Sequence, residues 1–153
     1  MALIDHHHED ENWFEVLHIW EKVANWVRFH PSEADFRSQL KNLLGLLWNE
    51  KDWLKAHYPP QGKKIEEFIN ASTYLCIIAD LANAIKHRKL TKTPRSTSLQ
   101  TDYYGRLTTG RGATRRMYFI NDGKGAHPEI MEILRGAIDE CEELRLLLSS
   151  GKL

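Results

Sequence analysis

Apolar residues recur at spacings of three and four along four stretches of the chain, the pattern of helices that each bury one face. These stretches run from about Asn12 to Phe29, Glu33 to His57, Lys63 to Arg88 and Pro128 to Leu148. Short connections between helices favour neighbours that run antiparallel. The pattern therefore predicts an all-α fold: an antiparallel four-helix bundle, with an insertion between the third and fourth helices.

Local signals mark the ends of these helices. Pro31 ends the first, because the residue before a proline avoids helical backbone angles. Ser32 suits the N-cap of the second helix, and "YPPQG" (58–62) breaks that helix. The centre of the third helix, from Tyr74 to Leu81, is apolar on nearly every side apart from Asp80. Such a helix is usually buried, so we expect it at the centre of the domain.

The first helix has an apolar stripe and two aromatic residues outside it. The stripe consists of Trp13, Val16, Leu17, Trp20, Val23, Ala24 and Val27. Trp26 and Phe29 lie off this stripe, and large apolar side chains away from the core face are typical of association surfaces. We therefore expect a homodimer with Trp26 and Phe29 in its interface.

The segment between the third and fourth helices lacks the helical pattern and contains strand-like and turn-like stretches instead. "YYGRL" (103–107) and "RRMYFIND" (115–122) have the character of short strands, and "TTGRGAT" (108–114) that of a turn. We expect a basic β-hairpin or loop inserted over about residues 92–125. Residues 1–11 are predicted to be a flexible acidic and His-rich tail, and residues 12–153 a single domain.

Composition narrows the class of protein. The 153 residues are 42% apolar and 27% charged, which is ordinary for a globular domain. No apolar run reaches the roughly 18 residues of a membrane span, and the start lacks the features of a secretory signal. The two cysteines, Cys76 and Cys141, are interpreted as buried thiols. We expect a cytoplasmic protein with no membrane partner.

The charges are unevenly distributed although they sum to zero. Residues 86–124 contain ten basic and two acidic residues, a net charge of +8, so the rest of the chain carries −8. A basic stretch on an acidic body indicates an anionic partner, self-association through opposite patches, or a solvated surface with no partner. Tyr103, Tyr104 and Tyr118 could stack on bases or cover the helices.

The third helix carries polar residues near its end. Asp80, Asn83 and His87 stand at i, i+3 and i+7, which places them on one helix face, with Lys86 on an adjacent face. Buried polar groups are costly unless they are hydrogen-bonded. These residues therefore either satisfy one another and a neighbouring helix, or open onto a site.

The motif "DLANAIKH" (80–87), near the end of a central helix, resembles the HEPN superfamily of nucleotide-binding helical domains. The resemblance implies an RNA- or nucleotide-linked role of the toxin or defence type. In many members, an arginine, a polar residue and a histidine from two subunits cleave RNA in a shared cleft without a metal. His87 matches the family histidine and Asn83 the polar residue. Ala82 stands at the arginine position, which favours binding over cleavage.

Besides a non-catalytic RNA or nucleotide site on the same helix face, two further interpretations of this motif remain open. In the first, Asp80, Asn83 and His87 form a metal-independent catalytic site, while phosphates are bound by cations at Lys86, Arg88, Arg111, Arg115 and Arg116. In the second, the polar residues form a structural network, and the protein is a non-enzymatic helical dimer whose basic hairpin docks a protein partner. We expect no cofactor and no metal site, because the imidazoles of "HHHEDE" (6–11) lie in a tail without fixed geometry.

Overall fold

The computed structural model describes the backbone of residues 10–87, 100–108, 113–121 and 125–153, and side chains for 10–83, 113–120 and 125–153. Most of these residues are helical. The elements are α2 (Glu11–Ala24), α3 (Trp26–Phe29), α4 (Glu33–His57), a 3₁₀ turn (Pro59–Gln61), α5 (Gly62–Ala71), α6 (Leu75–His87), β1 (Gln100–Thr108), β2 (Thr114–Asn121) and α7 (Ile130–Ser149).

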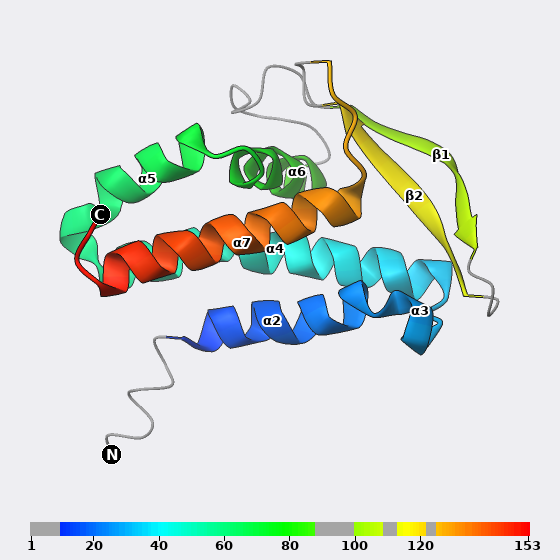
Figure 1. The fold of residues 1–153 in the computed structure, drawn as a ribbon, viewed down its shortest axis with the longest axis horizontal. Coiled ribbons are helices and arrows are strands. Elements are labelled where there is room, and N and C mark those ends of the chain that lie inside the picture. The colour runs from blue at the N-terminus through cyan, green and yellow to red at the C-terminus, as the bar shows by residue number, and fades with distance from the viewer. Residues whose placement is uncertain (1–9, 88–99, 109–112, 122–124) are drawn as a thin grey trace.

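The long helix α4 forms the centre of the arrangement. It contacts α2, α5 and α6, and α6 in turn contacts α7. Figure 1 shows that α2 runs opposite to α4, whereas α7 runs in the same direction as α4. The core between these helices contains fully buried side chains, among them Val16, Leu43, Ile78, Ile133 and Leu134.

The first predicted helix is interrupted, so its predicted continuous extent is wrong. Asn25 separates α2 from α3, and its side-chain Nδ2 donates to the Glu21 carbonyl oxygen at 2.7 Å. This break rotates the residues that follow. As a result Trp26 is 6% exposed and belongs to the core, while Val27 is 36% exposed, the reverse of the prediction. Phe29 is exposed.

The second predicted helix has the predicted ends. It spans Glu33–His57, and the Ser32 hydroxyl accepts a hydrogen bond from the Asp35 N–H at 3.1 Å. This contact is the expected N-cap. The helix is 25 residues long, or about 37 Å at 1.5 Å per residue, so its ends lie at opposite ends of the molecule.

The third predicted helix is in fact two, α5 and α6. The chain leaves the helical conformation at Ser72. The Glu140 carboxylate of α7 then accepts hydrogen bonds from the backbone N–H groups of Thr73, Tyr74 and Leu75, at 2.8, 2.8 and 2.9 Å. A carboxylate at a helix N-terminus satisfies free donors and complements the helix dipole. Glu140 therefore stabilises the break that the apolar pattern did not reveal.

Strands β1 and β2 pair antiparallel, from Gln100 opposite Asn121 to Thr108 opposite Thr114. They lie across the end of the molecule where α4 and α7 begin (Figure 1). After β2 the chain runs back along the strand, where the Ile120 N–H donates to the Pro128 carbonyl oxygen at 3.0 Å. Helix α7 then begins at Ile130, two residues later than expected, with Glu129 as its N-cap.

Several predicted features lie outside the described residues. These are most of the His-rich tail, the turn containing Arg111, and Arg88. Both cysteines are buried and neither forms a disulfide, as expected for packed thiols. Over the described ranges, none of the helices combines the length and the apolar character that crossing a bilayer requires.

Candidate functional site

The polar residues of α6 do not share one environment. Asp80 is only 2% exposed and interacts with another group, whereas Asn83, nearly one turn later, is half-buried. Lys86 and His87 lie in the last turn of the helix, and their side chains are outside the described set. Asp80 therefore belongs to the protein interior. Ala82, at the position where the resembled family has arginine, is also buried, at 9% exposed.

Arg115, one of the predicted phosphate-binding residues, is enclosed within the protein. It is 5% exposed, and its two terminal nitrogens pair with both carboxylate oxygens of Glu129, with Nη1 3.2 Å from Oε2. Nη1 also donates to the Arg116 carbonyl oxygen at 3.0 Å. The guanidinium carbon lies 5.2 Å from the centre of the Trp26 ring and 5.6 Å from that of Phe36. Arg115 is thus held by a bidentate ion pair close to two aromatic rings.

Glu129 joins three parts of the fold. Besides Arg115, its carboxylate accepts from the Tyr118 N–H at 3.0 Å and from the Met131 N–H at 3.4 Å. The first bond holds the returning chain against β2, and the second caps α7. The pair between Arg115 and Glu129 therefore attaches the two-stranded sheet to the helices.

Arg116 is also engaged, on the other side of the strand. Successive residues of a strand point to opposite faces, and Arg116 forms an ion pair with Glu33, the first residue of α4. Both side chains are about one-third exposed, at 36% and 32%. Two of the five predicted phosphate-binding residues thus have carboxylate partners within the chain.

A second polar constellation lies at the opposite end of α4, where sequence reasoning placed no site. The Glu50 side chain is 1% exposed, and its carboxylate accepts hydrogen bonds from Asn12 Nδ2 at 2.8 Å and from Arg145 Nη1. Asn12 also donates to the Leu46 carbonyl oxygen at 3.0 Å. The other arm of Arg145 pairs with Asp10. Helices α2, α4 and α7 each contribute one member of this buried network.

The network shifts the pKa values of its members. Burial raises the pKa of Glu50 above its ordinary value of 4.5, although the hydrogen bond from Asn12 and the charge of Arg145 act in the opposite direction. Burial alone would lower the pKa of Arg145, but its bonds and charge interactions with Asp10 and Glu50 leave it raised. Burial and the nearby charge of Glu50 also raise the pKa of the Cys141 thiol, which is therefore unreactive.

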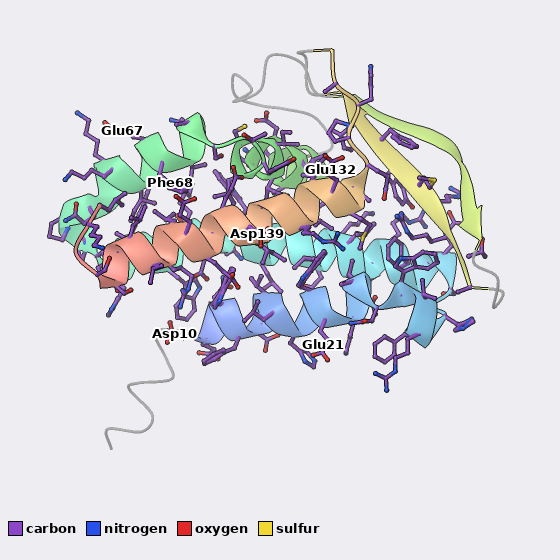
Figure 2. All side chains as sticks on the ribbon, viewed as in Figure 1. Asp10, Glu21, Glu67, Phe68, Glu132 and Asp139 are labelled. Carbon is purple, nitrogen blue, oxygen red and sulfur yellow. The ribbon has the colours of Figure 1, made fainter. Side chains whose placement is uncertain are left out.

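A cleft of about 420 Å³ opens beside this network. Its walls come from the start of α2, the end of α4 and the last turns of α7: Asp10, Trp53, Leu54, His57, Tyr58, Glu142, Arg145, Leu146 and Ser149. Asp10, labelled in Figure 2, lies at the same end of the molecule as the final turns of α7. Arg145 connects the cleft to the buried Glu50 carboxylate.

Sequence reasoning missed this region because its members lie on three different helices, and the pattern along one helix does not show which side chains it meets on another. The available signal was Glu50 itself, which lies between the apolar positions Leu47 and Leu54 on α4. A charge on that face requires a partner, since buried charges are paired. Nothing in the local pattern identifies Arg145, 95 residues away, as that partner.

The raised pKa of Glu50 predicts a specific pH dependence. A carboxyl whose pKa is raised by folding contributes stability fully below its unfolded value, and this contribution is lost as pH rises through the raised pKa. Glu50→Gln removes this titration. The free energy of unfolding of the wild type minus that of Glu50→Gln should therefore fall as pH rises from 4.5 and then level off. Denaturant titrations from about pH 4 to about pH 8 measure this difference. A difference that grows with pH would show that Arg145 outweighs burial.

The part of the chain that the structure describes contains no evident metal site. Within it, no group of three or more His, Cys, Asp or Glu side chains is arranged to hold an ion. Comparisons with known proteins add no constraint: no family model matches the chain, and neither a curated protein nor a solved structure matches it significantly.

Proposed function

We propose that the protein binds RNA through its basic segment, residues 86–124, and does not cleave it efficiently. The observation that carries the proposal is the charge of this segment, counted from the sequence after the two ion pairs among its described residues are set aside. Arg115 and Arg116 are matched by Glu129 and Glu33, which lie outside the segment. Setting those two aside leaves eight basic and two acidic residues, a net charge of +6. Such a density of positive charge favours contact with a phosphate backbone.

The α6 motif supports binding over cleavage. Metal-free cleavage requires a cation that stabilises the charge developing on the phosphate. Ala82 supplies none, and the buried Asp80 would not reach a substrate without leaving the core. In this proposal the protein is HEPN-like, its helices forming a four-helix bundle with a basic hairpin insertion, and Lys86, Arg88 and Arg111 contact the RNA. His87 and Asn83 stay candidates for the same surface.

The experiment is an RNA-binding titration at several salt concentrations. We expect the affinity for single-stranded RNA to fall steeply with salt, because each phosphate contact releases a counterion. The double change Arg88→Ala and Lys89→Ala should weaken binding to every RNA sequence and lower the salt slope by about 1–2. Fluorescence anisotropy with a labelled oligonucleotide measures both effects.

The matched control is the double change Lys63→Ala and Lys64→Ala. It removes the same charge from two exposed positions on α5, away from the sheet (Figure 1). Equal weakening by the two double variants, or absence of binding at low salt, would contradict the proposal. Arg115 and Arg116 are unsuitable for this test, because changing them breaks ion pairs within the fold.

A second candidate is a non-enzymatic helical dimer that acts as a protein-interaction module. The observation that favours it is the exposure of two large apolar side chains on α2 and α3, Phe14 at 51% and Phe29 at 55%. Exposed aromatic side chains are typical of association surfaces. This candidate takes precedence if the RNA titration fails.

A further inference from the structure

The cleft at the far end of α4 has the dimensions and composition of a binding site. Its volume of about 420 Å³ lies within the range of roughly 300–1,000 Å³ typical of small-ligand pockets. It also adjoins a buried network that contains groups with shifted pKa values, a combination characteristic of functional sites.

The charge of the cleft favours a cation. Arg145 is the only Lys or Arg among the residues that line the cleft. The cleft also contains two acidic residues, Asp10 and Glu142. Both ends of the Arg145 guanidinium are already paired, Nη2 with Asp10 and Nη1 with the buried Glu50. Counting Asp10, Glu50 and Glu142 against Arg145 gives a net charge of −2, or −1 when Glu50 is protonated. A phosphate or carboxylate ligand would meet carboxylates and an arginine that is already paired.

Aromatic and aliphatic walls complete the site. Trp53, His57 and Tyr58 line one side, with the His57 and Tyr58 rings edge to face at a centroid distance of 4.6 Å. Aromatic faces attract organic cations. Leu54 and Leu146 add apolar surface, and Leu146 is 67% exposed. Aliphatic stems of long basic side chains pack on such surfaces.

We propose that this cleft binds a guanidinium or ammonium group carried on an aliphatic stem, as in the side chain of arginine or lysine within a peptide. The charged head lies between Glu142 and the aromatic rings, and the stem lies along Leu54 and Leu146. This site is distinct from the proposed RNA-binding segment, because the described strands of that segment lie at the other end of the molecule (Figure 1).

The test uses Nα-acetyl-arginine amide as the probe, titrated into the full chain and followed by protein NMR chemical shifts. We expect saturable shifts around Trp53, His57 and Glu142. The matched ligand is Nα-acetyl-citrulline amide, which has a similar shape but no charge, and we expect it to bind at least fivefold more weakly. Equal binding of the two probes would overturn the proposal, as would tighter binding of a nucleoside monophosphate at the same residues.

The chain also offers a matched protein control. Glu142 and Glu143 are adjacent and exposed, but only Glu142 lines the cleft. Glu142→Gln should weaken binding of the arginine probe about three- to fivefold, the range for one exposed charge contact, and Glu143→Gln should leave it unchanged. Trp53→Phe, which keeps an aromatic ring, should weaken binding of the arginine probe more than Glu142→Gln does. Equal effects of the two glutamate variants would contradict the site.

The same chemical group is present in foreign peptides and in residues 86–124 of a second copy. Sedimentation equilibrium with and without the probe distinguishes these sources. Oligomers that dissociate when Nα-acetyl-arginine amide is added identify a second copy as the natural occupant. A chain that stays monomeric while it binds the probe identifies a peptide of another protein. We expect the RNA titration to be unaffected by Glu142→Gln, so failure of one proposal does not imply failure of the other.

Discussion

Glu129→Ala is expected to cost about 3–5 kcal/mol of folding free energy, because it leaves the Arg115 guanidinium buried and unpaired. Arg115 is 5% exposed and lies close to the Trp26 and Phe36 rings, so water cannot readily replace the carboxylate. The same change frees the Tyr118 N–H and removes the cap of α7. Since small domains are stable by about 5–15 kcal/mol, a large fraction of the total would be lost. Thermal and denaturant unfolding measure the effect.

Two further variants isolate the cause of this loss. Glu33→Ala breaks the neighbouring pair with Arg116, which is about one-third exposed, and should cost less than about 1 kcal/mol. Combining Glu129→Leu with Arg115→Leu removes both charges of the buried pair, and should recover much of the stability. A cost for Glu129→Ala no larger than that for Glu33→Ala would show that Arg115 finds another partner.

Gly136→Ala is expected to destabilise the protein by about 1–3 kcal/mol, although alanine is the better helix former. A Cβ at Gly136 would lie 2.2 Å from Cδ2 and 2.7 Å from Cγ of the Tyr74 ring. The Cγ atom joins the ring to its own Cβ, so a small rotation of the ring does not relieve the contact. Tyr74 also donates its backbone N–H to Glu140, one turn beyond Gly136 on α7. Moving Tyr74 would therefore disturb the start of α6.

Gly45→Ala provides the control for the same substitution within a helix. Gly45 lies inside α4, and a Cβ there has no atom within 4 Å. We expect this change to stabilise the protein by about 0.5–1 kcal/mol through helix propensity alone. Opposite signs for the two glycine variants would be the expected outcome. If Gly136→Ala were also stabilising, the contact between α6 and α7 would have to be looser than the structure describes.

The parts of the fold predicted from sequence are those with local causes. Helix α4 begins and ends as predicted because Ser32 caps it and Pro59 follows shortly after its end. The breaks at Asn25 and Ser72 were missed. Asn25 lacks a strong helix-breaking signal, and the break at Ser72 depends on Glu140, which bonds to Leu75 across 65 residues. A carboxylate that caps a distant helix leaves no trace in the apolar pattern.

For the candidate site too, the sequence identified the charged residues but not their partners elsewhere in the chain. Arg115 and Arg116 were grouped with Arg111 because they share a basic stretch, but alternation along β2 sends the first two to opposite faces. The acidic residue at the start of α7, Glu129, was the signal that Arg115 had a partner nearby. Asp80, which the sequence grouped with Asn83 and His87, is buried, whereas Asn83 is half-buried.

The buried pair of Glu50 and Arg145 has a consequence for how the protein folds as it is synthesised. Helices α2 and α4 leave the ribosome well before α7, and within them Glu50 has Asn12 as a neighbour but no cation. Burying its carboxylate at that stage would be unfavourable, because a charge without a partner is costly in the protein interior. We therefore expect the early helices to associate only loosely until the last helix emerges, so that stable packing of the nascent chain comes late.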